Sequence, residues 1–227
     1  MAGYEAPGDF LPVTTADGSF TLRSATLAAQ YHSHHGAVAE AMHVYIQNGL
    51  RTIRKSHVDL LDVGLGTGLN ALLTMVEAER MGIAVNYHAI EPHPVAIEVV
   101  RALDHPSHAG SQERGLEFMQ LMSARAGEAA EVGIGFRFSC SPTTVQELDL
   151  HDEFDLVYFD PFAPRAQPAL WTEGIFRIVH RAMRSGGIMV TYCAKGSARR
   201  AMQAAGFEVE RVVGPPHKKH MLRAVRP

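Results

Sequence analysis

The chain has 227 residues, of which 46% are hydrophobic and 20% are charged, and its formal net charge is −3. These values are ordinary for a folded globular protein, and the net charge argues against a generally basic nucleic-acid binder. The charge is unevenly placed, because residues 195–227 contain eight Lys or Arg against two Glu, which makes this segment about +6. A patch that binds polyanions and an ordinary solvated surface both fit that segment.

Cysteine usage and the N-terminal sequence bear on the compartment. Cys140 and Cys193 are the only cysteines and lack metal-site spacing, which fits a reducing environment. The first ten residues contain no positively charged region followed by an apolar run, so no secretory signal is predicted. No stretch approaches the roughly 20 apolar residues of a membrane span. We therefore expect a cytosolic protein that does not interact with membranes.

Taken in chain order, the pattern predicts strands that alternate with helices. A glycine-rich turn over 64–68 interrupts this alternation, and a largely helical insert over 94–130 is expected to form a lid or a substrate wall. The predicted strands are 17–23 with its preceding turn, 58–63, 85–90, 134–139, 154–159, 188–192, 207–213 and 221–225. The predicted helices are 40–54, with Ala41, Val44, Tyr45 and Ile53 on its inner side, 70–81, 171–184 and 196–204.

This alternation predicts an α/β domain with a mostly parallel sheet. The last two strands, joined by the turn GPPHKKH, are expected to form a hairpin in which one strand runs antiparallel to the others. In such sheets, ligands bind outside the carboxyl ends of the strands. We therefore look for functional residues where the strands end.

The glycine-rich turn follows the strand 58–63. Gly64, Gly66 and Gly68 permit a sharp turn and a close approach to a ligand, but their spacing differs from the dinucleotide fingerprint G-x-G-x-x-G. Glu91 ends the next strand about 23 residues after Gly68, where a carboxylate can accept both ribose hydroxyls of a nucleoside. A capping or surface acid is the structural alternative for Glu91. Together the turn and Glu91 indicate a nucleoside cofactor, and the spacing favours S-adenosylmethionine over a dinucleotide.

Asp160 comes directly after the apolar strand 154–159, and Pro161 then stops the strand and stiffens the turn. A carboxylate here can accept a hydrogen bond from an amine while the amine is aligned with the methyl group to be transferred. The turn resembles the D-P-P-[YF] turn of amino-group methyltransferases, with Phe162 available to stack on a base. The alternative role of Asp160, a helix N-cap, is weakened because the next helix begins well downstream. Trp171 is a candidate wall of the substrate pocket, with core packing as its alternative.

With these residues in place, the chain resembles the methyltransferase domain of MnmC and its stand-alone relative MnmD. These are tRNA methyltransferases that convert 5-aminomethyl-2-thiouridine at the wobble position to its methylaminomethyl form. The motifs that carry the resemblance are DGSFTL, Gly64 to Asn70, Asp160 to Pro164, Leu170 to Thr172, and Gly214 to Pro216 with Lys218 and Lys219.

The resemblance implies a fold and a domain organisation. The fold is a Rossmann-like class I methyltransferase with a mostly parallel seven-stranded sheet and an antiparallel last strand. Residues 1–57 would form an N-terminal extension that caps the substrate side, and residues 58–227 the S-adenosylmethionine-dependent methyltransferase domain, with the helical insert at about 94–130. Because no flavin-dependent oxidase domain follows, a monofunctional, cytoplasmic methyltransferase is expected.

The resemblance also assigns residues. Asp160 is the expected catalytic residue, and the expected cofactor-binding residues are Gly64, Leu65, Gly66, Gly68, Asn70 and Glu91. The expected substrate-binding residues are Tyr31, His32, Phe162, Trp171, Arg199, Lys218 and Lys219. Basic residues of the C-terminal segment, namely Lys195, Arg199, Arg200, Lys218 and Lys219, are expected to hold phosphates of the tRNA anticodon stem-loop. No metal is expected, because methyl transfer needs none and no acid joins the histidine cluster His32, His34 and His35.

Ser141 and Pro142 stand where such domains often carry Gly-Asp next to the adenine, so two alternatives are expected, a weaker cofactor affinity or an adenine contact from Cys140, Thr143 or Gln146. Two other functions stay open on the residues alone. The same fold with Asp160 would permit methylation of a small-molecule amine. The departure at Ser141 would permit a nucleoside- or RNA-binding module without catalysis.

Overall fold

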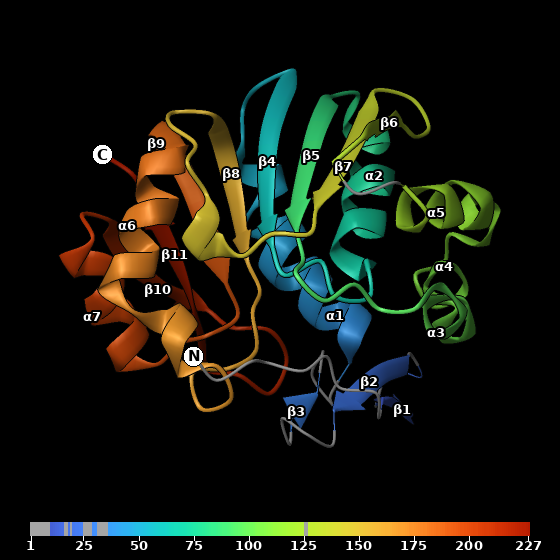
Figure 1. Ribbon diagram of the computed structural model, residues 1–227, viewed down its shortest axis with the longest axis horizontal. Coiled ribbons are helices and arrows are strands. Elements are labelled where there is room, and N and C mark those ends of the chain that lie inside the picture. The colour runs from blue at the N-terminus through green and yellow to red at the C-terminus, as the bar shows by residue number, and fades with distance from the viewer. Residues whose placement is uncertain (1–9, 16–17, 19, 25–28, 31–35, 125–126) are drawn as a thin grey trace.

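The computed structural model describes the chain except residues 1–9, 16–17, 19, 25–28, 31–35 and 125–126. An eight-stranded sheet forms the centre of the described part, with the strand order β10-β11-β9-β8-β4-β5-β7-β6 (Figure 1). Its strands are β4 (His57–Val63), β5 (Ala84–Ile90), β6 (Ala129–Glu131), β7 (Phe136–Ser141), β8 (Phe154–Phe159), β9 (Met183–Thr191), β10 (Glu208–Val213) and β11 (His220–Val225). A small separate sheet contains β1 (Phe10–Thr14), β2 (Phe20–Ser24) and β3 (Ala29–Gln30).

The five central strands run parallel, whereas β11 is antiparallel to both β9 and β10. The expected mostly parallel α/β sheet and its antiparallel last strand are confirmed. The expected number of seven strands is one too few, because β6 adds an antiparallel strand beside β7. This strand is only three residues long and reads Ala-Ala-Glu, which is too short to show a strand period in the sequence.

Helices cover both faces of the sheet, so the domain has three layers (Figure 1). The neighbouring residues Leu60 and Leu61 of β4 point to opposite faces, because side chains alternate along a strand. Leu60 packs in the cluster formed with α1 (Ala37–Ala41) and α2 (Leu69–Met81). Leu61 packs in the cluster formed with α6 (Glu173–Ala182) and α7 (Gly196–Ala204). All six residues of β8 are buried, which explains why its sequence is apolar or aromatic except at Asp155.

The region predicted as one helix over 40–54 is less regular. It begins as α1, continues as the π-helix η1 (Met42–Gln47) and ends in the 3-10 helix η2 (Leu50–Thr52). The expected inner residues Ala41, Val44 and Tyr45 are buried, whereas Ile53 is only partly buried. The Tyr45 ring lies 5.0 Å from the ring of Tyr158 on β8. A π-helix is a local widening that often occurs beside functional sites, and here it brings Tyr45 against the central sheet.

The insert contains the predicted helical segments, namely α3 (Ile97–Leu103), α4 (His105–His108), η3 (Gln112–Arg114) and α5 (Gly115–Met122). It stands at the end of the molecule away from α6 and α7 (Figure 1). No described residue of the insert lines the main cavity, and its expected role as a lid or substrate wall stays a prediction. His105 Nε2 lies 2.8 Å from Thr67 Oγ1, so the insert supports the glycine-rich turn from behind. The division of the chain at residues 57 and 58 stays a prediction.

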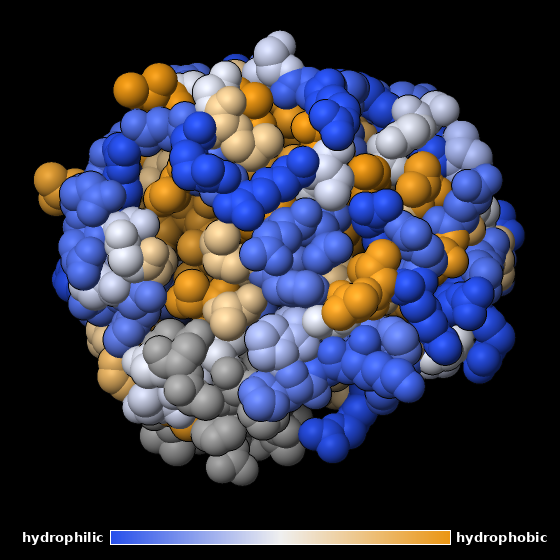
Figure 2. All heavy atoms as spheres, turned by 180° about the vertical axis from the view of Figure 1, so that it is seen from behind, coloured by the Kyte–Doolittle hydropathy of each residue, from blue (hydrophilic) through white to orange (hydrophobic). Residues whose placement is uncertain are grey.

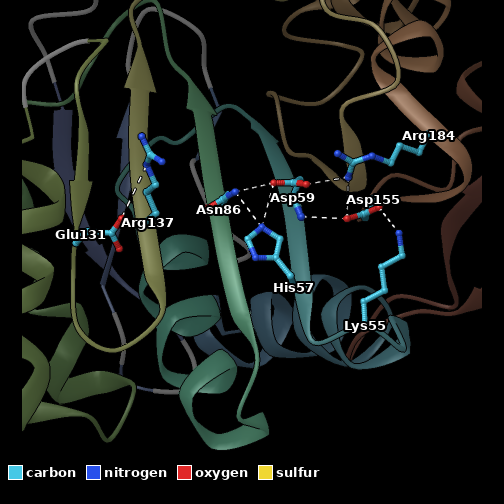
Figure 3. Close-up of polar contacts among 8 residues, drawn as sticks. All are labelled: Lys55, His57, Asp59, Asn86, Glu131, Arg137, Asp155 and Arg184. Atoms are coloured by element: carbon cyan, nitrogen blue, oxygen red, sulfur yellow. Dashed lines mark hydrogen bonds and ion pairs between the residues drawn. The ribbon is translucent and has the colours of Figure 1, made fainter.

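A polar network ties the amino ends of four strands together (Figure 3). Asp59 of β4 accepts hydrogen bonds from Asn86 of β5 at 2.8 Å and from Arg184 of β9 at 2.9 Å. Asp155 of β8 accepts a 2.6 Å bond from Lys55. Burial alone would raise the pKa of Asp155, but the bonds from Lys55, the Asp59 N–H and Arg184 hold it below its ordinary value. This edge of the sheet is therefore held together by structural ion pairs, and ligands of such sheets bind at the opposite edge, outside the carboxyl ends of the strands.

The surface of the molecule carries both hydrophilic and hydrophobic residues. On the face turned away in Figure 1, hydrophilic residues cover most of the area and hydrophobic ones gather in small regions (Figure 2). The exposed large hydrophobic residues Leu116, Ile134 and Val213 come from separate elements. In the described part of the chain, no helix is both long enough and apolar enough to cross a bilayer.

Candidate active site

A cavity of about 660 Å³ lies at the carboxyl ends of β4, β5 and β8. This volume is within the range of cavities that hold small molecules. Its walls come from the glycine-rich turn, the end of β5, the segment after β7, the turn after β8 and three residues from distant elements. The lining residues used below are Glu40, Gly64, Leu65, Gly66, Asn70, Glu91, Thr143, Val145, Gln146, Asp160, Phe162, Arg165, Tyr192 and Lys218.

Glu91 is fixed at the edge of this cavity by the glycine-rich turn. The Gly66 N–H donates a 3.1 Å hydrogen bond to Glu91 Oε2, and the His93 N–H donates a 3.0 Å bond to Glu91 Oε1. Burial raises the pKa of Glu91 above its ordinary value, and the two N–H groups oppose this effect. The carboxylate is thus held in one orientation beside the turn, as expected for a group that accepts ribose hydroxyls.

The three glycines of the turn all have left-handed backbone conformations, with φ of 98° at Gly64, 54° at Gly66 and 81° at Gly68. A Cβ on Gly64 would lie 3.1 Å from the carbonyl oxygen of Asp160, so this glycine lets the two turns touch. A Cβ on Gly68 would lie 2.3 Å from Met122 Sδ, so this glycine makes room for the insert. At these two positions the protein's own packing requires glycine, in addition to any ligand.

Asp160 lies at the centre of the site. Its backbone N–H donates to the Val63 carbonyl at 3.0 Å, and its Oδ2 accepts a 2.9 Å bond from the Asn70 side chain. Asn70, expected to bind the cofactor, therefore also holds the expected catalytic carboxylate. The Tyr45 hydroxyl is close enough to lower the pKa of Asp160, although this contact falls outside strict hydrogen-bond geometry.

Burial raises the pKa of Asp160 to about 7. The Tyr45 hydroxyl and the Asn70 amide lower it, the nearby Glu40 carboxylate raises it, and the Lys218 ammonium lowers it. A carboxyl group with a pKa near the working pH can both take up and release a proton. The geometry and the pKa together suit Asp160 for accepting a proton from a substrate group in the cavity.

Two side-chain hydrogen bonds support the turn after Asp160. Trp171 Nε1 donates a 2.8 Å bond to the Phe162 carbonyl, and the Tyr192 hydroxyl donates a 2.9 Å bond to the Pro161 carbonyl. Phe162 lines the cavity, as expected for a residue that stacks on a base. Trp171, in contrast, is buried and its ring packs edge-on against Phe159, so its structural alternative fits better than a role as pocket wall.

The other expected substrate residues are dispersed. Lys218 lines the cavity and its Nζ lies 2.7 Å from Glu40 Oε2, and its expected contact with RNA phosphates stays a prediction. Arg199 is half-buried on α7 and Lys219 is exposed between β10 and β11, and neither lines the cavity. Tyr31 and His32 lie outside the described residues, as do the other two histidines of that cluster.

The segment after β7 forms one wall of the cavity, through residues 143–146. Ser141 contributes its carbonyl, which accepts a 3.1 Å bond from the Glu91 N–H, and Cys140 does not line the cavity. Val145 offers a buried apolar surface and Gln146 an exposed amide. An apolar face and a hydrogen-bonding amide are contacts that suit a purine, and the adenine contact from this segment stays a prediction.

Sequence reasoning missed Glu40 and Tyr192 as site residues and placed Tyr45 only in the core. Tyr192 is the last residue of the predicted strand 188–192, at its carboxyl end, which was a usable signal. Glu40 and Tyr45 gave no such signal, because they precede the sheet and reach the site only through tertiary packing. In the described residues, no group of three or more His, Cys, Asp or Glu side chains could hold a metal ion.

S-adenosylmethionine fits this arrangement of residues. The cavity combines a turn of left-handed glycines, a fixed carboxylate at Glu91 and an apolar surface at Val145. These groups suit a methionine moiety, a ribose and an adenine, respectively. The carboxylates of Glu40 and Asp160 face the same space, where they favour a positively charged group such as a sulfonium.

The chain is similar to known methyltransferases. A family model described as S-adenosyl-L-methionine-dependent methyltransferase matches residues 119–227. The bifunctional tRNA 5-methylaminomethyl-2-thiouridine biosynthesis protein MnmC of Ralstonia nicotianae is 28% identical over 211 residues, which are 87% of this chain and 32% of that protein. MnmC of Cupriavidus metallidurans is 29% identical over 227 residues, or 92% of this chain and 33% of that protein. The chain therefore spans about a third of the length of the curated relatives it matches.

Solved structures show the same fold. The crystal structure of MNMC2 from Aquifex aeolicus superposes with a TM-score of 0.72 and 22% identity, covering 96% of this chain and 70% of that one. Spermidine synthase from Thermotoga maritima superposes with a TM-score of 0.50 and 10% identity, covering 92% of this chain and 69% of that one. The Rossmann-like fold, the S-adenosylmethionine cofactor and the resemblance to the MnmC methyltransferase domain are confirmed.

Proposed function

Since this chain is a relative of the MnmC methyltransferase domain and has the fold of S-adenosylmethionine-dependent methyltransferases, we propose that it methylates the aminomethyl nitrogen of wobble 5-aminomethyl-2-thiouridine in tRNA. The observation that carries this proposal is the position of Asp160. Its carboxyl group, with a pKa of about 7, is hydrogen-bonded to Asn70 at the start of the cofactor-side helix and faces the same cavity as Glu91.

The chemistry of an amine explains why such a carboxylate is needed. An aminomethyl group is largely an ammonium at neutral pH, and its nitrogen has no free lone pair until one proton leaves. Asp160 is placed to accept that proton, and the carbonyl groups of its rigid turn are further acceptors for the remaining N–H bonds. S-adenosylmethionine supplies a methyl group on a positively charged sulfur, which keeps the electron pair of the broken S–C bond as the new N–C bond forms.

Positioning accounts for much of the rate in such an in-line displacement. The turn that carries Asp160 is held by the Trp171 and Tyr192 hydrogen bonds, and Asn70 sets the direction of the carboxylate. Phe162 lies on the cavity wall, where its ring can stack against the pyrimidine. These residues would present the exocyclic nitrogen to the methyl group.

Recognition of tRNA would come from the basic residues around the cavity. Arg165 is exposed at the cavity, and Lys195, Arg200 and Lys219 are exposed on neighbouring C-terminal elements. Contacts of this kind with phosphates position the RNA and weaken with salt. With tRNA as the substrate, the reaction would take place in the cytoplasm. The matched relatives also contain sequence beyond the aligned part, so the second activity implied by their bifunctional names is not assigned to this chain.

The test uses S-adenosylmethionine with a labelled methyl group, the purified protein and tRNA from cells that lack this modification. After digestion to nucleosides, label is expected in 5-methylaminomethyl-2-thiouridine, and the rate should fall as salt is raised. Label in a small-molecule amine but in no RNA would move the function to the first alternative. Binding of the cofactor without any methyl transfer would favour a binding module and contradict the proposal.

A further inference from the structure

The Lys218 ammonium lies in a small cage inside the cavity. Its Nζ is 2.7 Å from Glu40 Oε2 and 4.6 Å from the centroid of the Tyr192 ring. All three residues line the cavity that contains Asp160. A carboxylate combined with an aromatic face is a typical binding site for an alkylammonium ion.

The backbone presents Lys218 to this cage. The Lys218 N–H donates a 2.9 Å bond to the Pro215 carbonyl, and a Cβ on Gly214 would lie 2.4 Å from the Lys218 carbonyl oxygen, so only glycine fits the start of the turn. On the other side, His43 Nε2 lies 2.9 Å from the Val213 carbonyl, which joins the hairpin to the helical segment that carries Glu40. Glu40 and Lys218 are therefore brought together by a defined contact of two distant parts of the chain.

The two partners of the ion pair differ in exposure. The Lys218 side chain is 32% exposed, whereas that of Glu40 is 13% exposed. Lys218 can thus turn out to solvent, while Glu40 stays fixed at the cavity wall. A second ammonium at the same position would keep the largely buried Glu40 carboxylate paired, so its exchange for Lys218 leaves no buried charge without a partner.

The side chain of Lys218 ends in a primary amine on a CH₂ group, as does the aminomethyl group of the proposed substrate. We propose that Glu40 and the Tyr192 ring form the binding site for the substrate's alkylammonium group, and that Lys218 occupies this site until the substrate displaces it. This inference rests on the proposed function and adds a specificity site to it. Once bound there, the ammonium faces Asp160, which accepts its proton before methyl transfer.

A purely structural ion pair makes a different prediction. If Lys218 only fastened the hairpin to the N-terminal helix, its loss would weaken the fold and affect every RNA ligand alike. If it competes with the substrate ammonium, its loss should favour only RNA that carries the amine. An internal competitor reduces the apparent affinity of a ligand in proportion to the fraction of sites that it occupies. The ratio of the affinities for RNA with and without the amine therefore distinguishes a competing Lys218 from a structural one.

The experiment measures that ratio with S-adenosylhomocysteine present, so that no turnover occurs. The Kd of tRNA carrying 5-aminomethyl-2-thiouridine is compared with the Kd of the same tRNA carrying 2-thiouridine, because phosphate contacts cancel in the ratio. The preference for the amine is expected to fall about tenfold in Glu40→Gln and to rise about threefold in Lys218→Met. The controls Glu98→Gln and Arg101→Met, which repeat the loss of a carboxylate and of a basic group on the exposed surface of α3, should leave it unchanged.

An unchanged preference in Glu40→Gln, or a reduced one in Lys218→Met, would overturn the inference. The double variant Glu40→Gln/Lys218→Met removes the risk that one unpaired charge distorts the fold, and it should show the low preference of Glu40→Gln. Methyl transfer to the same tRNA is assayed in parallel. If the RNA is methylated but its binding preference does not depend on Glu40, the proposed function stands and the ammonium site is refuted. If the free aminomethyl nucleoside binds in a Glu40-dependent way but no RNA is methylated, the ammonium site stands and the proposed function is refuted.

Discussion

The side-chain amide of Asn70 donates a 2.9 Å hydrogen bond to Oδ2 of Asp160. Asn70 belongs to the first turn of α2, directly after the glycine-rich turn, and Asp160 follows β8. The bond thus connects the part of the site that suits the cofactor with the carboxyl group that would act on the substrate. Together with the backbone bond from the Asp160 N–H to the Val63 carbonyl, it couples the positions of the two sides.

Replacing Asn70 should change the pH dependence of the reaction. The bond from Asn70 lowers the pKa of Asp160, which is about 7. In Asn70→Ala this stabilisation of the carboxylate is lost, so the pKa should rise and the pH at which kcat reaches half its maximum should move upward. A profile of kcat against pH, compared with that of the wild type, measures the shift. Asn86→Ala, at the opposite edge of the sheet, should leave the profile in place, and an equal shift in both variants would remove Asn70 from this role.

Asp160 should also lower the stability of the protein at alkaline pH. Its pKa is about 7 in the folded chain against an ordinary value of 3.8, so the folded state keeps a proton that the unfolded state loses. The free energy of unfolding should therefore fall as pH rises from about 4 to about 7. Asp160→Asn removes this term and should stabilise the protein at pH 8 by roughly 1–4 kcal/mol, with little effect at pH 4.

Denaturant titration of both proteins at the two pH values measures this difference. Asp149→Asn, whose carboxylate is well exposed, serves as the control. An equal gain in the free energy of unfolding at both pH values would show that burial does not raise the pKa of Asp160.

Gly68 should not tolerate a side chain. The backbone there has φ of 81° and an added Cβ would lie 2.3 Å from Met122 Sδ. Gly68→Ala is therefore expected to destabilise the fold by about 2–4 kcal/mol, from the left-handed conformation and from overpacking. Combining it with Met122→Ala should recover the part due to overpacking. Thermal unfolding of the two single variants and the double variant measures the coupling, and simple additivity would show that the insert does not press on the turn.

Glu91 should control cofactor affinity without affecting the chemical step. It is held by the Gly66 and His93 N–H groups at the edge of the cavity. Glu91→Gln keeps one acceptor oxygen but loses the charge that favours ribose hydroxyls, so the Kd for S-adenosylmethionine is expected to rise about 10- to 100-fold. Titration calorimetry measures this change. A normal Kd together with a reduced kcat would show that Glu91 acts elsewhere in the reaction.

Local patterns carried much of the fold and part of the site. The apolar sequence of β8 and the abrupt stop at Pro161 were sufficient to place Asp160 at a strand end. The glycine-rich turn and Glu91 followed in the same way, since parallel strands bring their carboxyl ends to one edge. These features depend on a few neighbouring residues, which is why they can be read from one sequence.

Features that depend on tertiary packing could not be predicted. The π-helix η1 has the sequence of an ordinary amphipathic helix, and its widening depends on packing against the sheet. Lys218 was predicted to be one of several basic surface residues, because nothing near it in the sequence indicates its pairing with Glu40. From the sequence alone, Trp171 fitted the pocket wall and the core equally well. The structure shows that its ring packs against Phe159 and that its Nε1 donates to the Phe162 carbonyl, so it supports the turn after Asp160.

The central claim is that Asp160 enables methyl transfer to an exocyclic amine of tRNA. The most direct measurement is a single-turnover assay on an anticodon stem-loop with 5-aminomethyl-2-thiouridine at the wobble position, read by mass spectrometry of the nucleoside. The account predicts one added methyl on the exocyclic nitrogen, and a rate about 10²- to 10⁴-fold lower in Asp160→Asn at a nearly unchanged Kd for S-adenosylmethionine. A methyl on any other atom, or a similar rate in Asp160→Asn, would contradict it.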